Sequence, residues 1–203
     1  GYNLSNEWIS GSEVGVGIPK NVIIDSETEI VGIPDGSGLR TIKGNLTITS
    51  GTFKLGNSIG DDLTIQGNFN NNGSFNPNNS LVTFNGSGLQ QVTGQTDFDY
   101  FTLNNSTDLQ INSNTTINQN LNLLQGRIIT GENTLVIANN AGVSKTDGYV
   151  IGNLRKYFTN SNKSRNFEIG TDNGYSPLNV TFNNITVDGY LSVNSKQVVH
   201  PSV

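Results

Sequence analysis

The sequence repeats a short triplet in which one polar residue stands between two apolar residues. Leu46-Thr47-Ile48 and Leu63-Thr64-Ile65 are two examples, separated mainly by Gly, Asn, Ser and Asp. Side chains two residues apart point to the same face of a β-strand, so each triplet predicts a short strand with one apolar face. The other predicted inward residues are Val82/Phe84, Phe101/Leu103, Leu109/Ile111, Leu121/Leu123, Leu135/Ile137, Phe53/Leu55, Phe69, Phe75, Ile117 and Ile128.

The spacing of these pairs restricts the fold. Comparable pairs recur about every 12 to 20 residues, which is too short for a βαβ unit and too irregular for an up-and-down barrel. Such spacing is typical of one winding of a β-solenoid, in which tight turns join two or three strands. Stacked windings, about 4.8 Å apart, would bury one continuous core. We therefore predict an all-β chain that forms a right-handed parallel β-helix, a handedness that follows the general rule for parallel crossovers.

The abundant amide residues fit the corners of such a solenoid. The chain has 32 Asn and 24 Gly, both of which tolerate the positive φ angles of sharp turns. The stretch NFNNNGSFNPNNS (68–80) is therefore interpreted as a run of ordered corners, because Phe69 and Phe75 lie within it. Stacked Asn side chains are expected to form ladders along the axis.

The pattern changes near residue 147. Residues 1–147 are predicted to form the solenoid, and the segment with Trp8 and Ile9 is expected to cap its first winding. From residue 148 the apolar segments are longer and their connections resemble hairpins, as in the stretch TDNG (171–174). Residues 148–203 are thus predicted to form an antiparallel β segment, either a cap or the start of a β-sandwich, and we expect the natural chain to continue.

The charge and composition exclude several functions. The net charge is −5 and 13% of residues are charged, so there is no basic face for nucleic acid. Four neighbouring basic residues, Arg155, Lys156, Lys163 and Arg165, are interpreted as a solvated face. The absence of Cys excludes disulfides and thiolate metal sites. No apolar run approaches the ~20 residues of a membrane span, so no membrane span is expected.

Several blocks of the sequence resemble a known family. They are LTITSGTFKLGNS with DDLTIQGNFNNNGSFNPNNSLVTFNGSGLQQVTG, LNLLQGRIITGENTLVIANNAGVSKTDGYVIGNLRKYF, FEIGTDNGYSPLNVTFNNIT, and the closing HP. Together they are similar to a repeat-rich β-solenoid segment of very large secreted surface proteins of Bacteroidota. These include adhesin-like and gliding-associated cargo of the type IX secretion system. The resemblance covers most of residues 14–203 and implies a spacer or stalk with no catalytic residues to carry over.

Residues able to support catalysis or bind a metal are sparse. β-Helix polysaccharide lyases and hydrolases need clustered carboxylates, often with Ca²⁺. The pairs Asp61-Asp62 and Asp97-x-Asp99 are both interpreted as solvated surface residues rather than metal ligands. His200 is the only His, so a triad built on it is not expected. We predict no catalytic, cofactor or metal site, and a remnant of a lyase or hydrolase is the weaker alternative.

Glycan binding remains an open alternative. Tyr100, Tyr157, Tyr175 and Tyr190 are candidate glycan contacts because aromatic faces stack on sugar rings. A half-buried structural role is the competing interpretation of each. An ordered hydroxyl face for ice or a crystalline polysaccharide has little support, since Thr47-x-Thr49 is the single Thr-x-Thr pair of its run.

The sequence therefore predicts a non-enzymatic structural or adhesive module, a rigid spacer or stalk, of a large secreted bacterial cell-surface protein. Its expected partners are the secretion machinery and neighbouring modules of the parent chain. The alternative is a carbohydrate-binding module that recognises extracellular glycans. A nucleic-acid partner and a cofactor are not expected.

Overall fold

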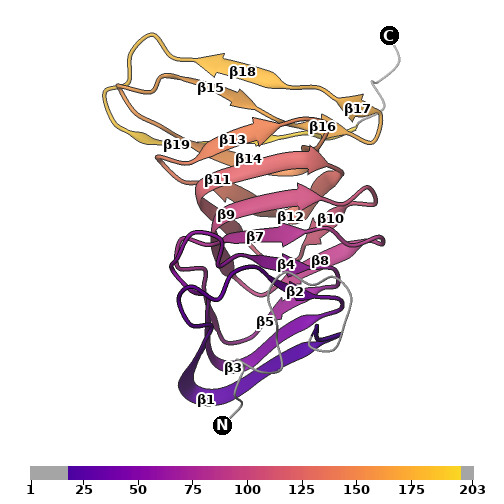
Figure 1. The fold of residues 1–203 in the computed structure, drawn as a ribbon. Helices are drawn as coiled ribbons and strands as arrows, with labels where there is room; N and C mark the ends of the chain where they lie inside the picture. The colour runs from indigo at the N-terminus through magenta and orange to yellow at the C-terminus, as the bar shows by residue number, and fades with distance from the viewer. Residues whose placement is uncertain (1–17, 198–203) are drawn as a thin grey trace.

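The computed structural model describes residues 18–197, and within them the chain winds repeatedly around one axis without any helix (Figure 1). Its strands are β1 (Val22–Gly32), β2 (Arg40–Ile42), β3 (Leu46–Lys54), β4 (Leu63–Ile65), β5 (Phe69–Asn71), β6 (Ser74–Asn76), β7 (Leu81–Phe84), β8 (Gln90–Thr93), β9 (Thr96–Asn104), β10 (Leu109–Ile111), β11 (Thr115–Gln125), β12 (Arg127–Ile137), β13 (Gly142–Lys145), β14 (Tyr149–Phe158), β15 (Ser164–Phe167), β16 (Gly170–Thr171), β17 (Gly174–Tyr175), β18 (Leu178–Thr181) and β19 (Gly189–Asn194).

Parallel strands stack in three columns. One column runs through β1, β3, β5, β8, β10, β12 and β14, which gives seven windings within residues 18–197. A second column runs through β2, β4, β7, β9, β11 and β13. Long strands such as β9 and β11 bend at a corner and supply the third column as well. The prediction of an all-β chain that forms a parallel β-solenoid followed by an antiparallel segment is confirmed.

Several windings are longer than the spacing predicted from the sequence, and the others lie at its upper end. Val22 lies opposite Leu46 and Leu109 lies opposite Ile128, so one winding takes between 19 and 24 residues. The expected 12 to 20 residues came from pairs on different faces of one winding, because β3 and β4 belong to different columns. A winding contains three strands. The distance in sequence between successive apolar pairs is therefore more often the distance from one strand to the next than the length of a full winding.

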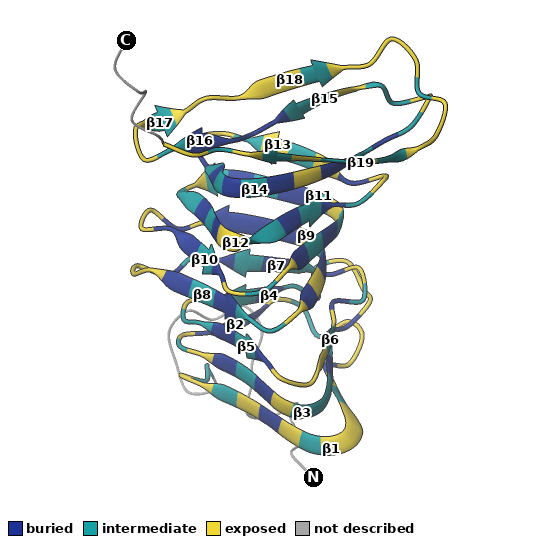
Figure 2. Cartoon of the chain, turned by 180° about the vertical axis from the view of Figure 1, so that it is seen from behind, coloured by how far each residue is buried: buried dark blue, intermediate teal, exposed yellow. Residues whose placement is uncertain are grey.

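The core is a continuous apolar column inside the windings. Buried residues recur along the strands from β1 to β14 (Figure 2). Every predicted inward pair is buried, from Leu46/Ile48 to Leu135/Ile137, and Phe75 is half-buried against the core. Phe98 lies at the centre of an aromatic cluster, with ring centroids 5.0 to 6.2 Å from those of its neighbours Phe69, Phe75, Phe84 and Phe101. Period-two apolar residues thus predict burial correctly in this fold.

The corners are ordered and rich in amides. The stretch 68–80 contains two short strands, β5 and β6, as well as corners, so its interpretation as corners alone was incomplete. Asn78 and Asn79 have φ angles of 53° and 65°. Side-chain oxygens of Asn21 and Asn45 accept hydrogen bonds from the backbone N–H one winding later, at 2.8 Å in both cases. The expected ladders therefore use side-chain oxygens and backbone N–H groups at this corner.

Pairing changes from parallel to antiparallel on one strand. β14 pairs in parallel with β12 along one edge and antiparallel with β19 along the other. The predicted boundary after residue 147 falls just before this strand, which belongs to both parts. Two further antiparallel pairs, β15 with β18 and β16 with β17, lie over the last winding (Figure 1). The expected N-terminal cap with Trp8 and Ile9, and His200, lie outside the described residues.

Candidate binding surface

A column of threonines runs along the outward face of the second strand column, where Thr41, Thr64 and Thr83 are partly exposed and Thr102 is buried. Thr41, Thr64, Thr83 and Thr102 are direct partners on consecutive strands β2, β4, β7 and β9, and Asn122 and Ser144 continue the row. Their spacing along the axis is that of adjacent strands, about 4.8 Å. The result is a straight row of six small polar side chains, which we call the Thr column.

The Thr column was missed in the sequence, although a signal was present. Each of its threonines is the middle residue of a triplet whose outer residues are buried, as in Leu63-Thr64-Ile65 and Val82-Thr83-Phe84. The middle residue must then point outward. Comparing these triplets with each other, rather than searching for Thr-x-Thr within one strand, would have found the row.

Tyr100 lies beside the Thr column. It is the direct partner of Leu81 and Asn120 on neighbouring strands, and 39% of it is exposed. Its side chain has no ring contact or hydrogen bond within residues 18–197. A partly exposed phenol next to a row of hydroxyls has the features of a sugar-stacking position.

The other tyrosine candidates meet partners on the antiparallel segment. Tyr157 and Tyr190 face each other across β14 and β19 with ring centroids 4.7 Å apart, and the Arg155 guanidinium carbon lies 4.5 Å from the Tyr190 centroid. Tyr175 is 5.9 Å from Tyr149, a residue that sequence reasoning had not selected. These two tyrosine pairs therefore form separate clusters, and Tyr100 belongs to neither.

Ring faces in these clusters are partly occupied by cations. The Lys145 ammonium lies 4.2 Å from the centroid of the Tyr175 ring. The Arg155 guanidinium covers the Tyr190 ring in the same way. Cation–π contacts of this kind stabilise the side chains but cover the surface on which a sugar would stack. Tyr100 is accordingly the strongest of the four glycan candidates.

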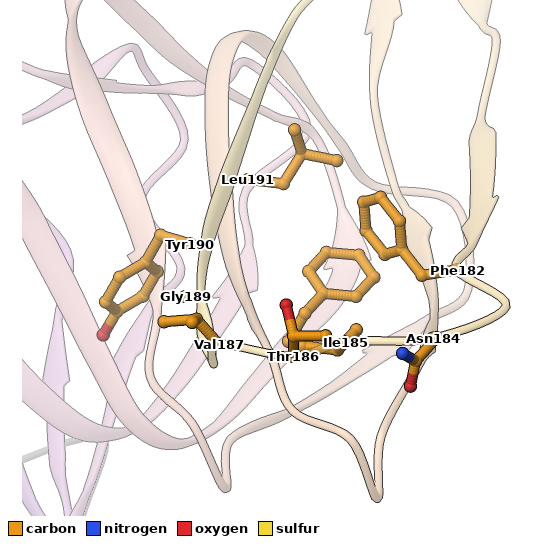
Figure 3. A pocket seen from close by; sticks show the side chains of 9 residues that line it. Phe182, Asn184, Ile185, Thr186, Val187, Gly189, Tyr190 and Leu191 are labelled. Atoms are coloured by element: carbon orange, nitrogen blue, oxygen red, sulfur yellow. The ribbon is translucent and has the colours of Figure 1, made fainter.

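A groove of about 300 Å³ opens between β19 and the segment that follows β18 (Figure 3). Phe158, Phe182 and Leu191 line its apolar wall, and Tyr190 points away to the other side of β19 (Figure 3). Polar groups in the lining are few, namely Asn184 and Thr186. The groove therefore lacks the convergent polar groups that would orient a small substrate.

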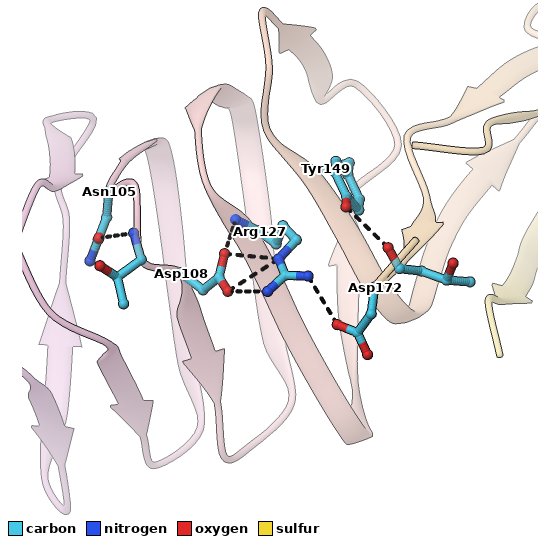
Figure 4. A network of polar contacts seen from close by, with 7 residues as sticks. Asn105, Asp108, Arg127, Tyr149 and Asp172 are labelled. Atoms are coloured by element: carbon cyan, nitrogen blue, oxygen red, sulfur yellow. Dashed lines mark hydrogen bonds and ion pairs between the residues drawn. The ribbon is translucent and has the colours of Figure 1, made fainter. Parts of the chain in front are cut away.

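Arg127 connects the solenoid to the antiparallel segment (Figure 4). Its guanidinium binds Asp108 at 2.6 Å and Asp172 at 2.9 Å, and Asp172 lies in the turn between β16 and β17. The hydrogen bonds that the Arg127 guanidinium donates to Asp108 raise the pKa of Arg127 above its usual value. Tyr149 adds a 3.0 Å hydrogen bond from its hydroxyl to the Thr171 carbonyl (Figure 4). These contacts hold the β16–β17 hairpin in place rather than present a site.

The predicted acidic pairs differ in their surroundings. Asp61 is buried, so its interpretation as a solvated residue was wrong; its carboxylate accepts hydrogen bonds from the N–H groups of Gly36, Gly38 and Ser58. Asp97 and Asp99 both lie on extended β9, and Asp99 accepts bonds from Asn79 and Asn118. Within residues 18–197, no group of three acidic or histidine side chains is placed to hold a metal ion.

The four neighbouring basic residues do not form one solvated face. Lys156 is only 4% exposed, because it points into the end of the core, so that interpretation was wrong for this residue. Arg165 is half-buried and its guanidinium donates to the carbonyls of Asn139 and Tyr157. Successive side chains of β14 point to opposite faces of the sheet, so Lys156 points inward and its neighbour Arg155 points outward.

Comparisons with known proteins do not identify the chain: no family model, curated protein or solved structure matches it. Among residues 18–197 there is no helix with the length and hydrophobicity to cross a membrane. The function must therefore be argued from the architecture, the surface and the sequence blocks.

Proposed function

We propose that this chain is a non-enzymatic structural or adhesive module, a rigid spacer or stalk of a large secreted cell-surface protein of the type IX secretion cargo class. The observation that carries the proposal is the unbroken stack of seven windings within residues 18–197, whose core runs along the axis. The resemblance of the sequence blocks to repeat-rich surface proteins supports the cell-surface location. The secretion machinery and neighbouring modules of the parent chain are its proposed partners.

The architecture suits a load-bearing role. Backbone hydrogen bonds between windings point along the axis, so a force applied along it is shared, at each interface between two windings, by the hydrogen bonds of the three strand columns. Each winding contacts its neighbours, and stability accumulates with the number of windings. A stiff object of this kind sets a distance between two other modules.

Single-molecule force spectroscopy tests the spacer proposal. The chain is tethered by its two ends and pulled in physiological buffer, with the same chain in denaturant as the control. We expect the folded chain to resist extension until it yields in discrete steps. Gradual extension that matches the denatured control would contradict a load-bearing spacer.

Glycan binding is a second candidate function, favoured by Tyr100 beside the Thr column. A glycan array probes it directly, with Tyr100→Ala as the test variant. Tyr190→Ala is the matched control, since the Tyr190 ring is already covered by Arg155. Selective binding that is lost in Tyr100→Ala and kept in Tyr190→Ala would establish the glycan function; an array without hits would exclude it for the glycans tested.

A further inference from the structure

Lys156 places an amine inside the end of the core. Its Nζ lies 2.6 Å from Glu168 Oε2 and 2.7 Å from the backbone carbonyl oxygen of Asn166. Phe158 and Phe167 are buried beside it, and the Phe167 ring centroid is 5.8 Å from Nζ. A buried ion pair contributes little net stability compared with apolar residues of the same size, so a further role for this amine is worth seeking.

The same carboxyl group also binds a side-chain amide. Asn166 Nδ2 donates to Glu168 Oε1 at 3.1 Å, while Lys156 occupies Oε2. Asn166 and Glu168 are two residues apart, and Lys156 reaches them from β14. Glu168 therefore stands between a nucleophile and a carboxamide, in contact with both.

The surroundings shift the Lys156 amine toward its uncharged form, while the 2.6 Å contact with Glu168 acts in the opposite direction. Burial lowers the pKa of Lys156; the charge and hydrogen bond of Glu168 oppose this effect, and the Arg165 charge adds to it. A desolvated lysine is a competent nucleophile once it is neutral. A carboxyl group in contact with both reacting groups can take a proton from one and give it to the other.

We propose that Lys156 and Asn166 form an intramolecular amide cross-link, with Glu168 as the proton carrier. The Lys156 Nζ–Asn166 Cγ bond forms, the Cγ–Nδ2 bond breaks and ammonia leaves. Glu168 takes a proton from Nζ and delivers one to the departing Nδ2, so it ends in its starting state and no other reagent is needed. The reaction requires the Asn166 side chain to rotate so that Cγ meets Nζ, which already lies 2.7 Å from the backbone carbonyl oxygen of the same residue.

The cross-link would fasten the antiparallel segment to the last winding. Lys156 lies on β14 and Asn166 on β15, so the bond joins the solenoid to the strands that cover its end. The chain has no Cys and cannot use a disulfide for this purpose. An amide is also stable to reductants, unlike a disulfide.

Mass spectrometry of the full purified chain tests the proposal. We expect the intact mass to be lower than the sequence mass by one ammonia, and a digest of the denatured chain to contain the Lys156 peptide joined to the Asn166 peptide. A wild-type chain at the full sequence mass, or a digest without the joined peptide, overturns the proposal.

Variants identify the reacting groups. Glu168→Gln keeps the side-chain shape but cannot carry the proton, so it should remain at its full mass. Asn166→Asp should lose water in place of ammonia, and Lys54→Arg, on β3 in an early winding, should still lose ammonia. Loss of ammonia in Lys156→Arg would indicate cyclisation of an Asn with its own backbone and would overturn the proposal.

Discussion

At the scale of single residues, the neighbouring winding limits which side chains fit at a corner, a limit that an isolated strand does not have. Gly94 has a φ of +88°, and a Cβ added there would lie 1.8 Å from the carbonyl oxygen of Asn71 in the previous winding. Gly60 has nearly the same φ, +87°, but has nothing within 4 Å of that position. A side chain at either position meets the same unfavourable backbone conformation, but only a side chain at Gly94 also clashes with the previous winding.

Alanine at these positions should have unequal effects. We expect Gly60→Ala to lower the free energy of unfolding by about 1 kcal/mol, because only the positive φ is unfavourable. Gly94→Ala should cost about 1–3 kcal/mol more, since the neighbouring winding must shift. Urea denaturation of both variants measures the difference. Equal losses would show that the windings are not in close contact at this corner.

Asp61 makes stability depend on acid pH. Burial raises its pKa, but hydrogen bonds from the backbone N–H groups of Gly38, Gly36, Ser58 and Ser37 together outweigh this effect and hold the pKa below its ordinary value. A carboxyl with a depressed pKa in the folded state contributes stability above its unfolded pKa and loses it as the pH falls through the folded value.

Replacing Asp61 should therefore flatten the acid limb of the stability curve. We expect Asp61→Asn to be less stable than the wild type at neutral pH, and to lose less further stability below about pH 4. Thermal midpoints across an acid pH series provide the measurement, with exposed Asp97→Asn as the control. An unchanged acid slope in Asp61→Asn would refute this role.

At the scale of elements, the corners join one winding to the next. Asn45 accepts a bond from the Asn68 N–H, while its own N–H donates to Asn21. At this corner, where the sheet turns, the side-chain oxygen of each Asn accepts the hydrogen bond that a backbone carbonyl of a neighbouring strand would otherwise accept. The order of the corners depends on this exchange as well as on the turn preferences of Asn and Gly.

A pair of substitutions isolates the side-chain oxygen. Asn45→Ala removes the acceptor of the Asn68 N–H and should lower the free energy of unfolding by about 0.5–1.5 kcal/mol. Asn45→Asp keeps an acceptor and should stay near the wild-type value. Denaturation midpoints compare the two variants. If Asp were as damaging as Ala, the ladder would not be the source of the stability.

The sequence predicted the strands better than their arrangement. Alternation within Leu63-Thr64-Ile65 is local, so the inward residues and the fold class were predictable from it. The register that aligns Thr64 with Thr83 depends on the number of residues in a whole winding, which varies, and so the Thr column was not found. Lys156 was placed on the surface because charge alone does not reveal that its strand ends against a covering hairpin. Its partner Glu168 lies twelve residues away and is brought near by the fold.

At the scale of the whole molecule, only 13% of residues are charged, and Arg127 and Asp108 form a partly buried ion pair. Salt screens exposed charges strongly and buried pairs weakly. We therefore expect thermal midpoints in low salt and in about 1 M sodium chloride to nearly coincide. A midpoint that moves strongly with salt would contradict this account of the surface.

Distances between windings test the central claim, the single in-register stack, most directly. Because the chain has no Cys, spin labels can be attached at pairs of cysteines introduced in the Thr column, with Ser144 held constant and Thr41, Thr64 or Thr83 as its partner. Electron paramagnetic resonance should give a backbone separation of about 24 Å for Thr41 and Ser144. The separation should fall by about 5 Å each time the partner position moves one winding closer to Ser144. Separations that do not decrease in these steps would contradict the stack.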